Sequence, residues 1–200
     1  MDAFLRLLKP ATHARVLDLG GTVELWNLLP ARLDVVLLNT SVSKARLEDA
    51  GRECRTSFTA IEGDACDLQR FAAGSFDIVF SNSVIEHLGD DRRVEQFARE
   101  VRRVGRSYWV QTPARGFPIE AHTGLPFFWY YPRPLRQKVA HAFDRKYGGH
   151  PWSCSISETR SFRFEDLRRL FPDSAVYRER LGGLTKSWSM YRQGGLHACG

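Results

Sequence analysis

Residues 15–22 have the sequence R-V-L-D-L-G-G-T, and this stretch decides the fold. The aliphatic run from Arg15 to Leu19 predicts a buried strand, and Gly20-Gly21 predict a tight turn directly after it. A short helix is expected over residues 23–29, where Pro30 ends it. A strand, a glycine turn and a helix in this order form the first unit of a doubly wound α/β sheet.

Strands and helices alternate along the rest of the chain. Further strands are expected at residues 34–39, 57–62, 76–80 and 107–112, and helices at residues 43–50, 91–104 and 164–171. The last two strands, at residues 174–181 and 185–192, are so close that they must form an antiparallel hairpin. We therefore predict a Rossmann-like α/β sheet of seven strands, mostly parallel, with one antiparallel strand near the C-terminus.

Length and composition predict one globular domain. The 200 residues are 43% hydrophobic and 26% charged, which is typical of a folded domain. We expect residues 1–192 to form this domain, residues 113–160 to form a lid or insertion over the substrate, and residues 193–200 to be a flexible tail. No apolar run is long enough for a transmembrane helix, and the first residues do not resemble a secretory signal. Four widely spaced cysteines favour reduced thiols in a cytoplasm.

Charge is divided unevenly along the chain. Residues 1–90 contain 9 Lys and Arg against 13 Asp and Glu, whereas residues 91–200 contain 20 against 10. A basic second half indicates an anionic substrate, a nucleic acid or an anionic membrane surface as partner. A solvated helix face is the alternative for residues 92–103, where apolar residues recur at helical spacing between the charges.

Ligands of a doubly wound sheet bind at the carboxyl ends of its strands. The residues expected there are Asp18, Gly20, Gly21, Thr22, Asn39, Gly63, Asp64, Ser81, Asn82, Thr112 and Pro113. Two adjacent glycines let the backbone turn sharply and approach a ligand closely. Asn39 follows Gly20 by 19 residues, which is about where such folds present a side chain to ribose hydroxyls.

Three other nucleotide or hydrolase motifs are absent from the sequence. Residues 20–25, G-G-T-V-E-L, do not form G-x-G-x-x-G, and Glu24 near the helix start would repel a pyrophosphate. The chain also has no Walker loop and no G-x-S-x-G elbow. Dinucleotide binding, nucleotide hydrolysis and a hydrolase triad therefore lack their anchoring residues.

From about residue 15 to residue 192 the chain resembles the class I S-adenosylmethionine-dependent methyltransferases, near the small-molecule branch called type 11. V-L-D-L-G-G-T is similar to the family's first motif, with Asp18 and Gly20 on its acidic residue and first glycine. I-E-G-D-A resembles the segment that packs on adenine, which implies an amino-group contact for Asp64 and a backbone contact for Ala65. The F-D-I-V-F-S-N-S-V-I-E-H-L stretch and the closing hairpin are also similar to the family's motifs.

The sequence departs from the family's pattern at three cofactor positions. Thr22 and Glu24 occupy the second and third glycine positions of D-x-G-x-G-x-G, and Asn39 replaces the usual ribose-binding acid. An amide can still bind hydroxyls, but it lacks the charge-assisted part of the interaction. A non-catalytic binding module on the same scaffold is therefore the alternative to an active enzyme.

Residues 113–160 form the segment expected to select the substrate. Six aromatic residues and five prolines stand between residues 113 and 134. We expect a lid over an apolar or aromatic acceptor, with Phe117, Phe127, Trp129 and Tyr130 binding the substrate, or a surface that touches lipid headgroups. A small separate core under a long loop is the alternative interpretation.

A hydroxyl acceptor needs a base to remove its proton, and histidine suits that role near neutral pH. We expect His122 to be the base and Glu120 to orient it, with His87 as a second catalytic candidate. The family resemblance also suggests a metal hypothesis, because some relatives carry E-x-x-E-H where this chain has Glu86 and His87. Ser83 replaces the first Glu of that motif, so a Mg²⁺ or Mn²⁺ site would need His122 to complete it.

The sequence thus predicts an S-adenosylmethionine-dependent methyltransferase acting on a small, amphipathic or lipid-like acceptor, at oxygen, by in-line methyl transfer. Two further interpretations stay open, namely the non-catalytic binding module and an RNA methyltransferase. The basic second half motivates the RNA interpretation and a peripheral contact with an anionic membrane.

Overall fold

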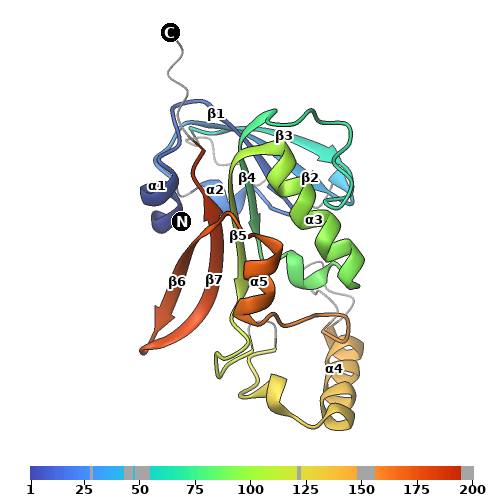
Figure 1. Ribbon diagram of the computed structural model, residues 1–200. Coiled ribbons are helices and arrows are strands. Elements are labelled where there is room, and N and C mark those ends of the chain that lie inside the picture. Colours follow the sequence, from blue (N-terminus) through green and yellow to red (C-terminus); the bar gives the residue numbers. More distant parts are fainter. Residues whose placement is uncertain (28, 43–46, 48–54, 121–122, 148–155, 195–200) are drawn as a thin grey trace.

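The structure is a computed structural model that describes residues 1–27, 29–42, 47, 55–120, 123–147 and 156–194. Figure 1 shows a twisted central sheet with helices on both faces and a smaller unit below it. The strands are β1 (Ala14–Leu19), β2 (Leu33–Asn39), β3 (Ser57–Glu62), β4 (Phe76–Asn82), β5 (Gly105–Pro113), β6 (Ala175–Leu181) and β7 (Leu184–Arg192). The helices are α1 (Asp2–Leu8), α2 (Glu24–Asn27), α3 (Asp91–Val104), α4 (Arg133–Tyr147) and α5 (Phe164–Leu170), with 3₁₀ turns η3 (Ile85–His87) and η4 (Phe128–Tyr130).

The strand order in the sheet is β3-β2-β1-β4-β5-β7-β6. Strands β1 to β5 pair in parallel, whereas β7 pairs antiparallel with both β5 and β6. Six strands therefore run in one direction and only β7 runs in the other. This arrangement confirms the predicted Rossmann-like sheet of seven strands with one antiparallel strand near the C-terminus.

A separate apolar core covers each face of the sheet. On one face, α1 and α2 bury Phe4 and Trp26 against Phe80 of β4 and Trp109 of β5. On the other face, α3 and α5 bury Phe97 and Leu167. Both faces are thus shielded from water, which is the condition under which a parallel sheet is stable.

Two helices were not expected from the sequence. Phe4 of α1 is 1% exposed and meets Trp26, Phe80 and Trp109 edge to face, so tertiary packing stabilises a helix of only seven residues. Helix α4 lies in the stretch that was expected to be irregular. Pro134 occupies its first turn, where the missing N–H of proline costs no intrahelical hydrogen bond.

Some sequence predictions fall wholly or partly outside the described residues. The helix expected at residues 43–50 is among them, as are the tail after residue 194 and three of the four cysteines. The fourth cysteine, Cys66, is buried. None of the helices in the described ranges has the length and apolar character needed to cross a membrane.

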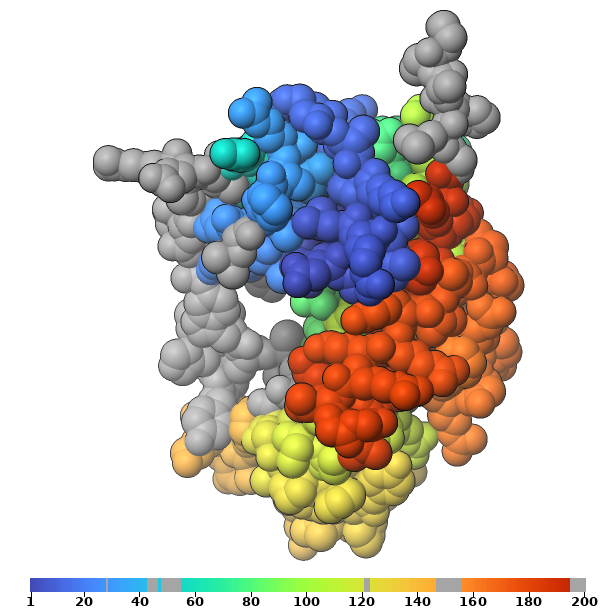
Figure 2. All heavy atoms as spheres, turned by 90° about the vertical axis from the view of Figure 1, so that its left-hand side faces the viewer, coloured from blue at the N-terminus to red at the C-terminus, as the bar shows by residue number. Residues whose placement is uncertain are grey.

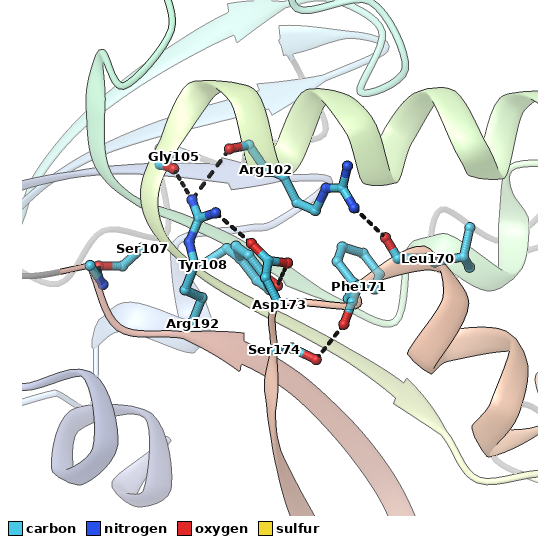
Figure 3. Close-up of polar contacts among 10 residues, drawn as sticks. Arg102, Gly105, Ser107, Tyr108, Leu170, Phe171, Asp173, Ser174 and Arg192 are labelled. Atoms are coloured by element: carbon cyan, nitrogen blue, oxygen red, sulfur yellow. Dashed lines mark hydrogen bonds and ion pairs between the residues drawn. The ribbon is translucent and has the colours of Figure 1, made fainter.

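A polar network ties the last strand to the centre of the fold (Figure 3). Tyr108 of β5 donates from its hydroxyl to Asp173 Oδ1 at 2.8 Å, and Arg192 of β7 donates to Asp173 Oδ2 at 2.6 Å. Arg192 also donates to the backbone carbonyls of Gly105 and Arg102, at 2.7 and 3.3 Å. The guanidinium therefore closes the junction of α3, β5 and β7.

Replacing Tyr108 by Phe removes one of the two side-chain donors to Asp173. Because Asp173 keeps its ion pair with Arg192 and is partly exposed, we expect the free energy of unfolding to fall by only about 1 kcal/mol. Urea unfolding at pH 7 measures this loss.

Tyr177→Phe on β6 is the matched control for Tyr108→Phe. The Tyr177 ring packs on Trp109, and among the described residues no hydrogen bond is made by its hydroxyl. Its substitution should change the free energy of unfolding by less than about 0.5 kcal/mol. An equal loss in both variants would show that the Tyr108 hydroxyl contributes nothing specific.

Candidate functional site

The carboxyl ends of β1, β2 and β4 meet at a turn made by the two adjacent glycines. Gly20 has φ of +77°, and a Cβ added to it would lie 2.6 Å from Val84 Cγ2. A Cβ added to Gly21 would lie 1.7 Å from Asp18 Oδ2, well inside the carboxylate. Both positions therefore require glycine, the first for its backbone conformation and the second for space. Figure 2 shows the surface hollowed between the blue N-terminal elements and the yellow segment.

Asp18 lies fully buried at the end of β1. Its Oδ2 accepts a hydrogen bond of 2.7 Å from Trp26 Nε1, whereas its Oδ1 is buried and has no hydrogen-bond partner among the described residues. Burial raises the pKa of Asp18 to about 7, although the hydrogen bond from Trp26 lowers it. A buried carboxylate with one satisfied oxygen is suited to bind a cationic or hydrogen-bond-donating ligand.

Ser81 places a second polar group of this kind on the neighbouring strand. It pairs with Leu19 in the register of β1 and β4, and its side chain is fully buried. Its Oγ has no hydrogen-bond partner among the described residues. Asn82, the next residue, is exposed at the end of β4. Two unpartnered buried oxygens thus lie at the carboxyl ends of adjacent strands, where doubly wound sheets bind ligands.

Asn39 stabilises the glycine turn. Its Nδ2 donates to the backbone carbonyl of Gly21 at 2.9 Å, and the side chain is 6% exposed. A carboxylate at this position could not donate that hydrogen bond and would repel the carbonyl oxygen. The amide is therefore matched to the altered turn, in which partly buried Thr22 follows Gly21.

Asp64 faces a partner that the sequence analysis did not anticipate. Arg93 of α3 binds both of its carboxylate oxygens, at 3.0 and 3.1 Å, and the backbone N–H of Cys66 donates to Oδ1 at 2.9 Å. Partial burial raises the pKa of Asp64, but these hydrogen bonds outweigh it and leave the pKa below its usual value. The neighbouring Ala65 is half-buried against the core. Asp64 therefore holds the loop after β3 to the start of α3.

Glu86 and His87 connect the end of β4 with two other segments. Glu86 is 1% exposed, and its Oε2 accepts from Thr112 Oγ1 of β5 at 3.0 Å. His87 Nδ1 lies 3.1 Å from Thr159 Oγ1, and the N–H of Arg160 donates to the Glu86 carbonyl at 2.8 Å. These contacts hold residues 159–160 against the carboxyl ends of β4 and β5.

The metal hypothesis gains no support from the described residues. Within these ranges, no three His, Cys, Asp or Glu side chains cluster closely enough to hold an ion. Ser83, at the position of the missing Glu, donates from its hydroxyl to Gln111 Oε1 at 3.0 Å. His122, the third expected ligand, lies outside the described residues, so the metal hypothesis stays a prediction.

His122, the expected base, lies outside the described residues, whereas Glu120, the side chain expected to orient it, lies within them. Glu120 is 3% exposed, and its Oε2 accepts from the backbone N–H and the hydroxyl of Thr123, at 2.7 and 3.0 Å. The N–H of Gly124 donates to the Glu120 carbonyl at 2.9 Å. Glu120 is therefore held by hydrogen bonds to residues 123 and 124.

The aromatic residues of the 113–160 segment divide into two groups. Phe128 is 2% exposed and forms a small core with Ala140 and Ile156, while Trp129 packs partly buried beside it. Phe117 is also half-buried. Phe127 and Tyr130, in contrast, are 59% and 63% exposed. The small separate core expected as the alternative is thus present, and the role of the exposed side chains stays a prediction.

Two cavities adjoin the 113–160 segment and a third lies between α3 and α5. The third measures about 640 Å³ and is lined mainly by charged side chains. A cavity of about 480 Å³ lies against α4 and residues 156–159. The cavity beside the end of β5 measures about 370 Å³ and is lined by Arg115, Gly116, Tyr130, Phe162, Arg163, Phe164 and Trp188.

The 370 Å³ cavity contains residues that sequence analysis missed. Trp188 belongs to β7 and pairs with Thr112 of β5, which places its ring next to a predicted strand end. Arg115 and Arg163 add two cations to the aromatic wall. The register between β5 and β7 brings Trp188 to Thr112, and the sequence does not specify that register.

Comparison with known proteins confirms the resemblance to the class I methyltransferases. A family model described as "Methyltransferase domain" matches residues 17–107, from the middle of β1 to the start of β5. No curated protein sequence matches the chain. The matched part contains the glycine turn and the strand ends that carry Asp18, Asn39, Asp64 and Ser81.

Solved structures share the fold over nearly the whole chain. An S-adenosylmethionine-dependent methyltransferase from Methanosarcina mazei is 14% identical, with a TM-score of 0.54 over 90% of this chain and 92% of that one. The small RNA methyltransferase HEN1 is 15% identical, with a TM-score of 0.59 over 97% of this chain and 24% of that one. An O-methyltransferase family protein from Burkholderia thailandensis is 17% identical, with a TM-score of 0.55 over 97% and 58%. At these identities the likeness concerns the fold.

Substituting Asp18 by Asn should remove a specific pH dependence of stability. In the wild type the folded state holds a proton on Asp18 up to about pH 7, whereas the ordinary pKa is 3.8. The contribution of Asp18 to the free energy of unfolding is therefore fully present below pH 4. It falls by about 1.4 kcal/mol per pH unit between the ordinary pKa of 3.8 and the raised pKa of about 7, and it is lost above that pH. Between pH 5 and pH 8 this amounts to roughly 2–3 kcal/mol.

Urea unfolding of wild type and Asp18→Asn between pH 5 and pH 8 tests this expectation. Every other titratable group is common to both proteins, so the difference between their free energies of unfolding isolates Asp18. The free energy of unfolding of Asp18→Asn should increase relative to that of wild type as pH rises. Parallel curves would mean that the carboxyl of Asp18 is ionised throughout this range.

Proposed function

We propose that this chain is an S-adenosylmethionine-dependent methyltransferase and that it methylates an oxygen atom of a small or amphipathic acceptor. The match to the methyltransferase family model and the shared fold support this proposal. The observation that supports a working cofactor site is the pair of buried, unpartnered oxygens at the ends of β1 and β4. Asp18 Oδ1 and Ser81 Oγ flank the glycine turn, and burying such atoms without a partner is costly unless a ligand satisfies them.

The residues at these strand ends fit S-adenosylmethionine. When bound, this cofactor supplies a methyl group activated by a positively charged sulfonium. Gly20 and Gly21 allow the backbone to approach it closely, and Asp18 offers a carboxylate oxygen to a cationic group. In this proposal Asn39 and Asp64 shape the site, through Gly21 and Arg93, besides any contact of their own.

The acceptor is proposed to bind in the 370 Å³ cavity beside the end of β5. Tyr130 and Trp188 provide an aromatic wall for an apolar or aromatic body, and Arg115 and Arg163 favour an acceptor with an anionic group. Phe117 and Trp129 are half-buried nearby in the sequence and contribute to the shape of this segment. Positioning and the exclusion of water then supply most of the rate acceleration.

Deprotonation of the acceptor hydroxyl is assigned to His122, with His87 as the second candidate. In this proposal Glu120, which is held by Thr123, has a positioning role. His87 is held by Thr159 beside the end of β4, so its ring has a defined orientation. A histidine base requires that turnover rise with pH as the imidazole loses its proton.

Calorimetric titration with S-adenosylhomocysteine tests the cofactor site. Wild type should bind with micromolar affinity, which corresponds to about −8 kcal/mol. Ser81→Ala should weaken binding by about tenfold and leave stability unchanged or slightly improved, because it removes a polar atom with no described partner.

Ser75→Ala is the matched control for Ser81→Ala. Its Oγ is also buried without a described partner, but it precedes β4 at the opposite end of the strand. It should leave the affinity unchanged. No binding by wild type would favour the non-catalytic module, and a gain in affinity with Mg²⁺ would support a metal site at Glu86 and His87.

The assignment of the base is tested by His122→Ala and His87→Ala in a methyl-transfer assay against hydroxylated aromatic acids. His122→Ala should retain S-adenosylhomocysteine affinity and lose at least about 100-fold in turnover. Its residual activity should also lose the rise with pH seen in wild type. Normal turnover by His122→Ala together with loss in His87→Ala would transfer the role to His87. Turnover on RNA alone would replace the small-molecule acceptor with RNA.

A further inference from the structure

Exposed hydrophobic side chains gather at one end of the molecule. Eight large hydrophobic side chains are exposed in the described ranges, and only Val42 and Leu47 lie elsewhere. The other six are Ile119, Phe127, Tyr130, Leu135, Leu181 and Leu184, with exposed fractions between 46% and 63%. We call these six the apolar end.

Two segments far apart in the sequence build the apolar end. Residues 119–120 and 123–135 lie in the yellow part of Figure 1, and residues 181–184 form the tip of the β6–β7 hairpin. Both are in the lower half of that view. Figure 2 shows the hairpin directly against the yellow segment. The N–H of Ala114 donates to the Lys186 carbonyl at 2.9 Å, and Tyr130 and Trp188 line one cavity. The two segments are therefore neighbours in space.

The backbone holds these side chains outward. Ile119 pairs with Pro126 in an isolated bridge, and Phe127 has φ of +54°, a conformation that non-glycine residues rarely adopt. Of the six, only Tyr130 lines any of the three cavities described above. The other five line none of these three cavities, and exposed apolar side chains that gather on a surface usually mark an interaction surface.

The charges around the apolar end are almost all positive. Residues 113–147 contain six Lys and Arg but only Glu120 and Asp144 as acids. Glu120 accepts from Thr123, and Asp144 accepts from the backbone and hydroxyl of Ser157. On the hairpin, Glu179 pairs with Lys186. These three acidic groups are thus satisfied within the protein. Glu158 beside α4 is exposed, but it is outnumbered by exposed cations such as Arg133, Lys138 and Arg180.

We propose that the apolar end docks on an anionic lipid bilayer. Apolar side chains on short projections can enter the boundary between headgroups and acyl chains, while surrounding cations bind anionic headgroups. Four of the six side chains are aliphatic. Aliphatic groups do not stack on bases, so this composition favours lipid over single-stranded RNA. This docking is independent of methyl transfer, and it needs neither cofactor nor acceptor.

Co-sedimentation of the full chain with lipid vesicles tests the proposal. Vesicles of phosphatidylcholine containing about one-third phosphatidylglycerol are compared with phosphatidylcholine alone, without cofactor. The partition coefficient should be at least about tenfold higher on the anionic vesicles and should fall as salt is raised. Equal binding to both compositions, or no binding to either, would overturn the proposal.

Matched variants separate insertion from nonspecific adhesion. The double variant Leu181→Ser and Leu184→Ser should lower the partition coefficient by about tenfold, whereas Val42→Ser, an exposed apolar residue elsewhere, should not change it. Arg180→Glu should lower the partition coefficient at least about fivefold. Arg92→Glu, at an exposed position of α3, should have a smaller effect.

Two controls keep these results interpretable. Urea unfolding shows whether each variant is folded, and S-adenosylhomocysteine affinity should be the same in all of them, which separates docking from the cofactor site. Equal losses in the test and control variants would overturn the proposal. Losses confined to the charge variants, with tighter binding to an RNA oligonucleotide than to vesicles, would assign this surface to nucleic acid instead.

Discussion

The buried carboxylate of Asp18 sets the geometry on which the candidate site depends. Its Oδ2 is held by Trp26 and lies so close to Gly21 that no Cβ fits between them. The Asp18 side chain therefore requires glycine at residue 21. The hydrogen bond from Asn39 to Gly21 then connects the end of β2 to the turn that follows β1. Because the buried Asp18 carboxyl must lose its proton at high pH, it destabilises the folded state there. Groups that destabilise the fold in this way are common at binding sites.

The altered glycine motif keeps its shape by a compensating change. Asn39 donates to the Gly21 carbonyl, which the acid usual in the class I methyltransferases that the chain resembles could not do. Asp64 is similarly engaged, because Arg93 of α3 binds both of its oxygens. Asn39 and Asp64 thus contribute to the architecture of the candidate site, while one oxygen each of Asp18 and Ser81 has no hydrogen-bond partner among the described residues.

The alternation of apolar runs and turns was enough to predict the sheet. Strand β3 and helix α3 have the predicted bounds, and the other strands differ by a few residues at their ends, where assignments always vary. Helix α1 was missed because its stability comes from packing of Phe4 against three aromatic rings distant in sequence.

The candidate site was predictable only where it follows strand ends. Asp18 and Ser81 directly follow apolar strand residues, so their place could be inferred from the pattern alone. Trp188 and Arg93 could not be found in this way, since strand register and helix rotation bring them to Thr112 and Asp64. The exposure of Phe127 depends on a left-handed backbone conformation that its side chain gives no reason to expect.

The position of β7 between β5 and β6 has a consequence for how the chain is made. Strand β5 ends at Pro113, but the strand that pairs with its outer edge ends at Arg192. During synthesis that edge is open while some seventy residues, the whole 113–160 segment among them, leave the ribosome. Unpaired strand edges are templates for association with other chains. A nascent chain truncated before β7 would thus expose Trp109 and Tyr108 beside an unpaired edge, which makes the C-terminal hairpin a protection against misassembly as well as the wall of a cavity.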